Sequence, residues 1–483
     1  GLINIMKELN MPKYKKIGLT YTEERKNGKK IEKIKDWTKR NDHRHHAMDA
    51  LTIAFTSHNH IQYINNLNAR RDETHIKHEI IQNIENLITH KIEGDKGNYK
   101  RKFIDPIPKF RVEAKKHLVS VLVSFKAKNK VMTRNINKTK INNGIVTKLE
   151  LTPRGQLHKE TIYGKSKTPQ LKPTKINKRF AFAKAKNIIH NEQRTLVLDH
   201  LKKFNNNPEI AFDSKTLKEN QLLWKEEPLK EVLCFEEVYT IRKDIAPDLN
   251  IDKVLDEGIK KILLKRKQEF NGNVKEAFSN LDKNPIWLNK EKGISIKRVT
   301  ITGVSNAESL HYKKDHLGNF ILNKSGEKVP VDYVSLGNNH HVAIYKDTKG
   351  KLQEKVISLF EAVARINEKL PIIDKEYNMH LGWEFLFTLK QNEMFVLSSD
   401  EFDVTTIDLL DEKNTMLISP HLFRVQKIAT KNYVFRHHLE TELIDLKETR
   451  GITWESIRST EPLNNFLKVR LDHTGKIVQV GEY

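Results

Sequence analysis

The 483-residue sequence contains a single cysteine, Cys234. One thiol cannot form an intrachain disulfide or build a zinc site from several cysteines, and this usage is typical of a reducing compartment. The sequence also has no run of about 18 apolar residues, which a membrane-spanning helix needs, and no apolar signal-peptide region near Gly1. We therefore expect no membrane partner.

Acidic residues are outnumbered: 86 Lys and Arg stand against 62 Asp and Glu, a net charge of +24. Such an excess attracts polyanions and makes phosphate binding depend on salt, so nucleic acid is the expected partner. The sequence has no phosphate-binding glycine loop, dinucleotide fingerprint or Gly-x-Ser-x-Gly motif. An ATPase, a dehydrogenase and a serine hydrolase therefore have no support.

The length predicts several folding units. Residues 1–90 have helical patterns, and residues 118–125 alternate with period two, which predicts a strand. Residues 126–180 are rich in lysine and turn formers, and residues 251–270 predict a helix. We expect an α+β fold with a helix-rich first part.

From residue 295 onward, alternating apolar runs are separated by glycine turns, which predicts antiparallel β structure. These turns lie at residues 316–319, 324–328, 347–351 and 473–476. One helix, at residues 359–370, is expected to interrupt the strands.

Residues 41–55, NDHRHHAMDALTIAF, carry the clearest chemical signal. Within residues 47–55 only Asp49 and Thr52 are not apolar, which predicts a helix buried on nearly every side. A buried carboxylate needs a partner or a cation. His46 lies one turn before Asp49, on the same helical face. An acid that binds a divalent cation and an imidazole that accepts a proton from water suit metal-assisted phosphodiester cleavage.

Two other interpretations of this segment stay open. A His-x-x-Asp pair on a helix can be purely structural. The histidines at positions 43, 45 and 46 also suggest zinc, although adjacent histidines on a helix point about 100 degrees apart, which disfavours a shared ion.

The segment resembles the third RuvC motif of the CRISPR type II effector nuclease (Cas-nine), most closely the compact type II-C branch. That motif has the form His-His-Ala-x-Asp-Ala, and its defined positions are matched by His45, His46, Ala47, Asp49 and Ala50. The resemblance implies that His46 is the general base and that Asp49 is a metal ligand. It further implies an RNase-H-like fold, two Mg²⁺ (or Mn²⁺) ions and cleavage of the DNA strand that is not paired to the guide.

In the family, the first RuvC aspartate, the second-motif glutamate and the HNH domain precede this motif, so they would lie upstream of Gly1. We find no replacement for those acids in the sequence, and one carboxylate with one histidine cannot hold two divalent cations. We therefore predict that the chain is the C-terminal part of such a nuclease, from the third RuvC motif onward, and that it does not cut DNA alone.

Lys159, Glu160 and Thr161 fall in a passage rich in glycine and lysine, which predicts a loop. By itself a Lys-Glu-Thr run is typical of an ordinary solvated loop. The resemblance places the family's phosphate-lock loop here, where backbone N–H groups and the Thr hydroxyl would hold a phosphate of the target strand.

Residues 422–438 resemble the late strands that precede the family's loop for reading the protospacer-adjacent motif (PAM). The donors that could address base edges are Lys431, Asn432, Arg436, His437 and His438, with Lys468 and Arg470 nearer the C-terminus. Each of them could equally be a polar residue on a hairpin surface.

The resemblance implies three domains: the closing part of RuvC (1–150), a phosphate-lock and wedge region (151–370) and a β-rich PAM-interacting domain (371–483). It implies guide RNA (crRNA and tracrRNA) and target double-stranded DNA as partners of a monomeric protein in a prokaryotic cytoplasm. A transposon-encoded RNA-guided nuclease is one alternative, disfavoured by the long chain after Asp49. A non-catalytic RNA- or DNA-binding module, with a structural His/Asp pair, is the other.

Overall fold

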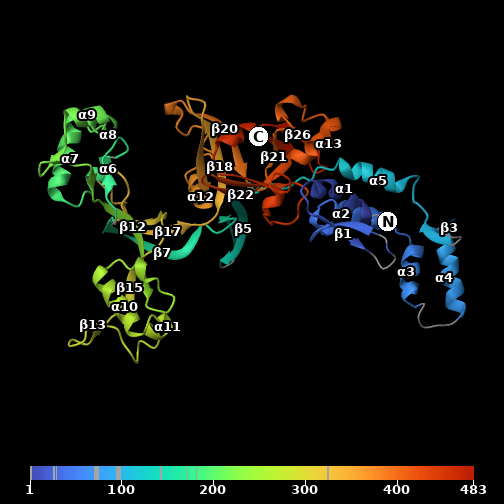
Figure 1. Cartoon of the computed structure of the whole chain (residues 1–483), viewed down its shortest axis with the longest axis horizontal. Coiled ribbons are helices and arrows are strands. Elements are labelled where there is room, and N and C mark those ends of the chain that lie inside the picture. The colour runs from blue at the N-terminus through green and yellow to red at the C-terminus, as the bar shows by residue number, and fades with distance from the viewer. Residues whose placement is uncertain are drawn as a thin grey trace. The chain divides into compact units, whose positions relative to one another are not determined.

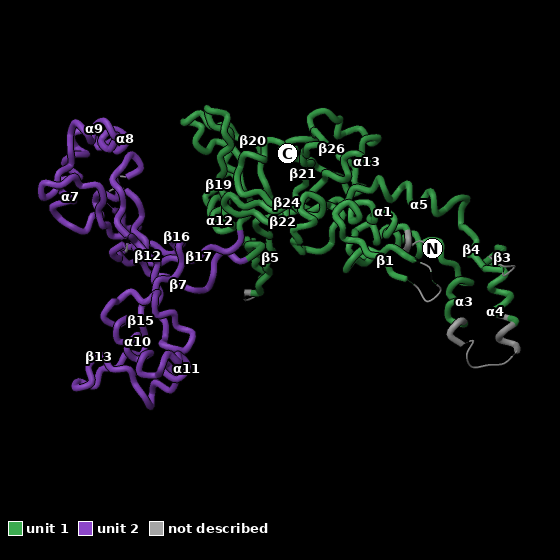
Figure 2. Tube along the Cα trace, viewed as in Figure 1, with its two compact units in different colours: residues 1–155, 339–483 green, residues 156–338 purple. Residues whose placement is uncertain are grey.

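The structure is a computed structural model that describes residues 3–24, 28, 30–69, 75–93, 99–141, 144–170, 172–180, 182–323 and 326–483. Side chains at positions 3, 4, 67–69, 75–78, 80 and 141 are not described. Helices and strands both contribute, and the named strands pair antiparallel throughout the described residues (Figure 1), so the predicted α+β class is confirmed. The chain forms two compact units, residues 1–155 with 339–483 (unit 1) and residues 156–338 (unit 2) (Figure 2).

The first part of unit 1 is built on helices. The elements are α1 (Ile3–Lys16), β1 (Thr20–Glu24), β2 (Lys30–Ile34), α2 (His45–Ala54), α3 (His58–Ala69), α4 (His75–Ile88), β3 (Thr89–Glu93), β4 (Tyr99–Phe103) and α5 (Phe110–Val119). Helices α1, α2 and α5 share a small buried core of Ile5, Met6, Met48, Ala114 and Leu118. Strand β1 pairs only with β2, and β3 only with β4, so the described part of residues 1–119 has no larger sheet.

Two predictions for the following segment are wrong. Residues 118–125 do not form a strand, because α5 takes in Leu118, whose side chain belongs to the helical core. Beyond the helix, residues 121–131 run without a strand partner, although Lys128 N donates to Gln391 O at 3.0 Å. The turn-rich structure expected of residues 126–180 is wrong as well, since β5 (Met132–Ile141) pairs with β6 (Gly144–Pro153) in a long hairpin.

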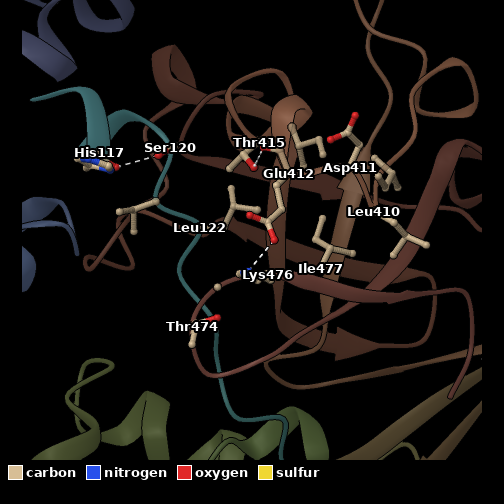
Figure 3. A pocket seen from close by; sticks show the side chains of 14 residues that line it. His117, Ser120, Leu122, Leu410, Asp411, Glu412, Thr415, Thr474, Lys476 and Ile477 are labelled. Carbon is tan, nitrogen blue, oxygen red and sulfur yellow. Dashed lines mark hydrogen bonds and ion pairs between the residues drawn. The ribbon is translucent and has the colours of Figure 1, made fainter. Parts of the chain in front are cut away.

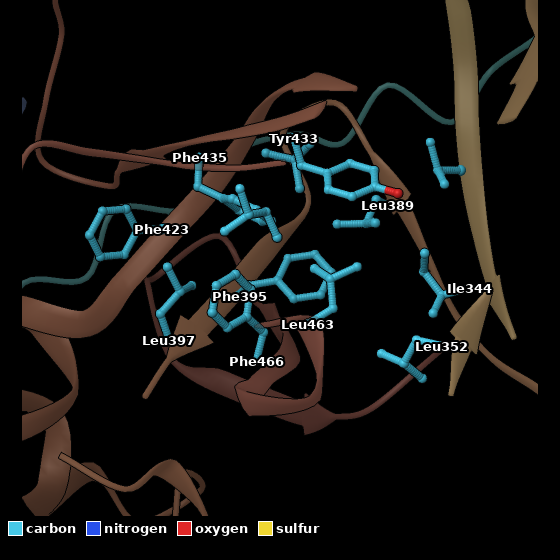
Figure 4. Close-up of a cluster of buried hydrophobic side chains, with 13 residues drawn as sticks. Ile344, Leu352, Leu389, Phe395, Leu397, Phe423, Tyr433, Phe435, Leu463 and Phe466 are labelled. Atoms are coloured by element: carbon cyan, nitrogen blue, oxygen red, sulfur yellow. The ribbon is translucent and has the colours of Figure 1, made fainter. Parts of the chain in front are cut away.

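The rest of unit 1 contains two facing antiparallel sheets. A three-stranded sheet has the order β19 (Leu352–Ser358), β18 (Asn339–Lys346), β20 (Glu384–Lys390). A six-stranded sheet has the order β24 (Trp454–Ile457), β23 (Asn432–His437), β22 (Leu422–Ala429), β21 (Met394–Leu397), β25 (Phe466–Leu471), β26 (Ile477–Val480). Between them lies a core rich in aromatic rings, shown in Figure 4. The predicted helix is confirmed as α12 (Leu359–Asn367), and Ser358 caps its start by accepting from Glu361 N at 3.0 Å.

Strand β21 is buried on both faces, which explains its uninterrupted apolar sequence. Phe395 and Leu397 face the core between the sheets, whereas Met394 and Val396 face a second cluster. That second cluster includes Leu122 from the extended segment after α5. The segment that joins the helical part to the sheets is thus part of the sheets' own packing.

The turns predicted at residues 347–351 and 473–476 are confirmed as the β18–β19 and β25–β26 connections. Gly475 has a φ of +89°, and a Cβ there would clash with the carbonyl oxygen of Leu122. Residues 316–319 also form a turn, closed by a bridge between Lys314 and Phe320. Residues 324 and 325 of the remaining predicted turn lie outside the described residues.

Unit 2 is organised around a five-stranded sheet. Its order is β15 (Arg298–Thr302), β12 (Phe235–Asp244), β7 (His158–Pro169), β17 (Pro330–Leu336), β16 (Glu308–Tyr312). One helical cluster has its own core and comprises α6 (Phe182–Ala185), α7 (Asn191–Lys203), α8 (Pro208–Ala211) and α9 (Ser214–Glu219). A second contains α10 (Glu257–Glu269), the helix predicted at 251–270, and α11 (Val274–Ala277).

Short two-stranded ladders complete unit 2: β8 (Thr174–Lys175) with β11 (Glu231–Val232), β9 (Leu223–Trp224) with β10 (Glu227–Pro228), and β13 (Trp287–Asn289) with β14 (Ile294–Ser295). Across the described parts of both units, none of the helices combines the length and the hydropathy that crossing a bilayer requires.

Candidate functional site

A buried ion pair fixes the turn that leads into α2. The Asp42 side chain accepts from Arg44 N at 2.9 Å, from the Arg44 guanidinium Nη2 at 2.7 Å and from Asn10 Nδ2 at 2.8 Å. Burial alone would raise the pKa of the Asp42 carboxyl, but the hydrogen bonds and charge of Arg44 outweigh it and hold the pKa below its usual range. Asp42 and Arg44 are therefore structural, and they set the direction in which α2 leaves the turn.

Backbone hydrogen bonds attach the same turn to the sheets of unit 1. His43 N donates to Leu439 O at 2.8 Å, and Thr441 N donates to Asn41 O at 3.2 Å. The residues before α2 thus lie against the segment that follows β23, nearly 400 positions later in the chain. The buried ion pair and these backbone hydrogen bonds together fix the start of α2.

His46 and Asp49, the predicted catalytic pair, lie on the surface of α2. His46 is exposed, and the Asp49 side chain is 50% exposed. Lys39 Nζ contacts Asp49 Oδ1 at 2.7 Å, and this hydrogen bond is the main cause that lowers the pKa of Asp49, with smaller contributions from the Lys39 charge and from His45 and His46. Both histidines are thus close enough to act on the carboxylate electrostatically. Lys39 is the partner that the sequence pattern did not reveal.

The expectation that α2 is buried on nearly every side is wrong. Met48 is its only buried residue, and Ile53 is 75% exposed. The physical reason is that α1 and α5 cover a single face of α2, where Ala47 and Leu51 are partly buried, and Ile53 lies outside that face. Asp49 is paired, as a carboxylate among apolar residues requires, but it is paired at the surface.

The three histidines around α2 point to different neighbours. The Nδ1 atom of His45 lies 2.7 Å from the Asp42 carbonyl oxygen, whereas His43 packs edge-on against Phe125 with ring centroids 5.3 Å apart. The rings of His45 and His46 are 3.9 Å apart and tilted by 35°. No three His, Cys, Asp or Glu side chains of the described residues gather as metal ligands. The donor set fits one ligand of a metal site, and it does not fit a complete two-ion centre.

Lys159, Glu160 and Thr161 lie in strand β7 rather than in a loop. Their part of the strand is irregular, because Ile162 pairs with Val334 and His158 pairs with Leu336 across a register shift. Three residues of β7 therefore oppose a single residue of β17, as in a bulge. Lys159 and Glu160 are exposed, and Thr161 is partly buried. The assignment to a loop is wrong, while the phosphate-binding role stays a prediction.

Three of the five PAM candidates are buried, which contradicts the expectation of available donors. Arg436 is 1% exposed, donates to the Gln426 side chain at 3.0 Å and pairs with Asp445. His437 is 5% exposed and His438 is fully buried. The reason is that the end of β23 lies inside unit 1, where these side chains satisfy buried backbone groups instead of facing solvent.

The two buried histidines are neutral structural groups. His438 Nδ1 accepts from Val123 N at 3.0 Å, and His437 Nε2 lies 3.0 Å from Ser419 O. Burial lowers the pKa of His438 to about 3 and places the pKa of His437 well below its usual value. A base-reading role for these two side chains does not fit this environment.

Lys431 remains accessible, whereas the side-chain oxygen of Asn432 is buried. Lys431 is exposed, has a φ of +48° in the turn between β22 and β23, and donates its backbone N–H to the Glu354 carboxylate at 2.9 Å. Asn432 is partly buried, at the first position of β23. Nearer the C-terminus, Arg470 is exposed, whereas Lys468 is 2% exposed and bound to Glu393 at 2.9 Å and to Glu482 at 2.7 Å. Lys468 is therefore structural.

A cavity of about 340 Å³ lies in unit 1, away from α2 (Figure 3). Its lining combines the end of α5 and the residues after it, such as His117 and Ser120, with residues of the sheet region, such as Asp411 and Thr474. Glu412 and Lys476 form an ion pair of 2.6 Å at this cavity. No residue of α2 lines it, so the cavity does not belong to the predicted catalytic pair.

Residues 1–132 match the model of the RuvC endonuclease subdomain 3. The predicted RuvC resemblance of the α2 segment is thereby confirmed. The comparison with curated proteins gave no match.

Among solved structures, the chain is similar to Cas9 of Streptococcus thermophilus, with 12% identity and a TM-score of 0.30 over 86% of this chain and 34% of that chain. It is also similar to the type II-C Cas9 of Actinomyces naeslundii (9% identity, TM-score 0.21, 49% of this chain and 29% of that chain). A third similar structure is Campylobacter jejuni Cas9 in complex with sgRNA and target DNA (14% identity, TM-score 0.21, 49% of this chain and 34% of that chain). The chain spans about a third of the length of these Cas9 chains.

Proposed function

We propose that this chain is the C-terminal part of a Cas9-type RNA-guided DNA endonuclease and that residues 1–132 complete a RuvC active site whose other acids lie elsewhere in the full protein. The observation that carries the proposal is the match of residues 1–132 to RuvC subdomain 3, with His46 and Asp49 at matching motif positions. Their exposure on α2 supports it, because a site assembled from several segments needs its third segment to present its reactive side chains outward.

In this proposal His46 accepts a proton from the attacking water, and Asp49 offers a carboxylate to a divalent cation. Mg²⁺ (or Mn²⁺), when bound, would polarise the phosphate and stabilise the charge that develops on its oxygens. The Lys39 ammonium holds the Asp49 carboxylate in its charged form, as its lowered pKa indicates. Lys39 must therefore release Asp49, or move with it, when a cation arrives. The strand cut would be the DNA strand that is not paired to the guide.

The chain alone is proposed to be catalytically incomplete. Asp49 stands as a single carboxylate beside Lys39, with no second and third ligand beside it among the described residues. Two divalent cations carry too much positive charge for one carboxylate to balance. The missing acids would come from the upstream part of the full protein.

The remaining residues are proposed to bind guide RNA and target DNA, in the cytoplasm of a prokaryote. The net charge of +24 supports a polyanionic partner. Lys159, Glu160 and Thr161 would contact a target-strand phosphate from the irregular segment of β7. Lys431 and Asn432 keep their proposed place near the PAM, since both lie at the tip of the β22–β23 hairpin.

The test is complementation in trans. The chain is mixed with a protein comprising the missing upstream part, guide RNA, Mg²⁺ and a plasmid that carries a matching target, and nicking is measured. We expect no nicking by the chain alone, nicking by the mixture, and loss of nicking with Asp49→Ala. Asp403→Ala, which removes an exposed helix-capping aspartate, is the matched control and should nick normally.

Two results would reject this proposal. Nicking by the chain alone would show that it is complete. If the chain and the upstream part assemble with guide RNA and bind the target but do not nick it, the non-catalytic module is favoured. In that module His46 and Asp49 are structural.

A further inference from the structure

The β5–β6 hairpin carries a surface that the proposed nuclease site does not use. Its strands pair over ten residues each, from Met132 opposite Pro153 to Ile141 opposite Gly144. They form a two-stranded sheet of their own, with no further named strand beside it in the described structure. Nearly all of the hairpin is exposed. A bare two-stranded ribbon of this length is marginally stable in water, which suggests that it works against a partner.

The two faces of the ribbon differ in charge. Alternate residues of a strand share a face, and so do residues that pair directly. By this register, one face, called here the cationic face, consists of Met132, Arg134, Ile136, Lys138, Lys140, Ile145, Thr147, Leu149, Leu151 and Pro153. It contains no acidic residue. The hairpin's only acid, Glu150, belongs to the opposite face.

The opposite face satisfies its own polar groups. Glu150 pairs with Lys148 at 3.0 Å and accepts from Asn137 Nδ2 at 2.6 Å, and Asn135 donates to the Thr152 hydroxyl at 2.7 Å. On the cationic face, by contrast, Arg134, Lys138 and Lys140 make no ion pair with any of the residues that the structure describes.

Apolar side chains lie between these cations and are open to solvent. Ile136 is 66%, Ile145 64%, Leu149 57% and Leu151 46% exposed. A protein partner would have to bury three cations together with these side chains, which is costly unless it supplies acids for them. A nucleic acid supplies the anions as phosphates and offers sugar and methyl groups for apolar contact.

We propose that the cationic face of the β5–β6 ribbon docks into the major groove of duplex DNA. That groove is about 12 Å wide and admits a two-stranded ribbon, whereas the major groove of an RNA duplex is too narrow for side chains to enter. Ten residues of a strand span about 33 Å, close to one turn of B-DNA. Arg134, Lys138 and Lys140 contact phosphates along the groove, and the apolar residues between them contact sugars and thymine methyl groups. The proposal rests on the proposed function only in taking DNA as a partner.

The experiment measures the affinity of the whole chain for a 24-base-pair DNA duplex of mixed sequence between 50 and 200 mM salt. Replacement of three phosphate contacts in Arg134→Gln/Lys138→Gln/Lys140→Gln should reduce the slope of log K against log [salt] by about 2.7. Over this fourfold salt range, the affinity of the unaltered chain should fall about 40-fold more than that of the variant. Ile136→Ser/Leu149→Ser should weaken binding without changing the slope.

The matched control is Lys283→Gln/Lys290→Gln/Lys292→Gln, which removes the same charge from exposed positions in unit 2. An equal change in slope for the control would overturn the proposal, because the effect would then come from net charge alone. Equal or tighter binding of an RNA duplex, again lost in the hairpin variant, would assign the ribbon to RNA and reject the DNA groove. All replaced side chains are exposed, so the variants should unfold at the temperature of the unaltered chain. The readout is binding, so it is independent of His46 and Asp49, and either proposal can fail without the other.

Discussion

Two of the three pairs of adjacent histidines in unit 1, His45–His46 and His437–His438, meet opposite surroundings. His45 and His46 begin α2 at the surface, beside the Asp49 carboxylate. His437 and His438 end strand β23 in the interior, where they bond to backbone groups and to Ser419. Burial keeps the second pair neutral, with the pKa of His438 lowered to about 3. Burial thus gives the second pair a structural role, whereas the first pair lies at the surface beside the carboxylate of the predicted catalytic pair.

The aspartates of the α2 segment show the same contrast, and their removal gives the largest expected effect on stability. Asp42→Ala leaves the buried Arg44 guanidinium without its partner, which should reduce the free energy of unfolding by about 3–5 kcal/mol. Asp49→Ala removes an exposed ion pair with Lys39 and should leave the free energy of unfolding nearly unchanged. Denaturant unfolding of both variants is the measurement. Equal losses would contradict the division into a structural and a surface carboxylate.

The buried histidines, His437 and His438, should make the free energy of unfolding depend on pH. Below the unfolded pKa of about 6.5, a histidine in the unfolded chain binds a proton that folded His438 excludes until about pH 3. The unfolded state therefore binds more protons, and the free energy of unfolding falls as the pH is lowered from 6.5 toward 3, by about 1.4 kcal/mol per pH unit for each such histidine.

Unfolding at pH 7, 6 and 5 measures this slope. The variant His438→Gln keeps a donor and an acceptor but no titrating group, so its slope should be shallower than that of the unaltered chain. A His438→Gln slope equal to that of the unaltered chain would show that His438 is not the buried group that excludes the proton.

The smallest expected effect concerns Lys39. Its hydrogen bond is the main cause of the lowered Asp49 pKa, so Lys39→Met should raise that pKa toward its ordinary value while stability changes little. An NMR titration of the Asp49 carboxyl carbon reads the change. Lys35→Met, a nearby exposed lysine, is the control and should leave the pKa in place. If the Asp49 pKa were unchanged in Lys39→Met, Lys39 would not be the cause of the lowered pKa.

The sequence predicted the α+β class, helix α12, helix α10 and the glycine turns of the β18–β19 and β25–β26 hairpins, because these features depend on local pattern. It also predicted the RuvC segment, since the spacing of His46 and Asp49 is a local property. Exposure could not be predicted in the same way. Ile53 of α2 stays at the surface because only one helical face is covered, and Arg436 is buried where it contacts Asp445, the Gln426 side chain and the Ile444 carbonyl oxygen.

The strand predicted at 118–125 failed for a related reason. Its alternating residues suit a strand, but tertiary contacts divide them, with Leu118 in the helical core and Leu122 in the packing of the six-stranded sheet. Lys39 was missed as the partner of Asp49 because ten positions separate the two residues, and no periodic pattern links a short 3₁₀ helix to the helix after it.

The most direct test of the central claim compares two neighbouring histidines in the complemented nuclease. His46→Ala should lower the nicking rate by about 10²–10⁴-fold, the usual contribution of a general base, without changing the unfolding temperature. His45→Ala should have a much smaller effect, since the His45 ring is occupied with the Asp42 carbonyl oxygen. Full nicking by His46→Ala, or a loss confined to His45→Ala, would contradict the assignment of His46 as the proton acceptor of this site.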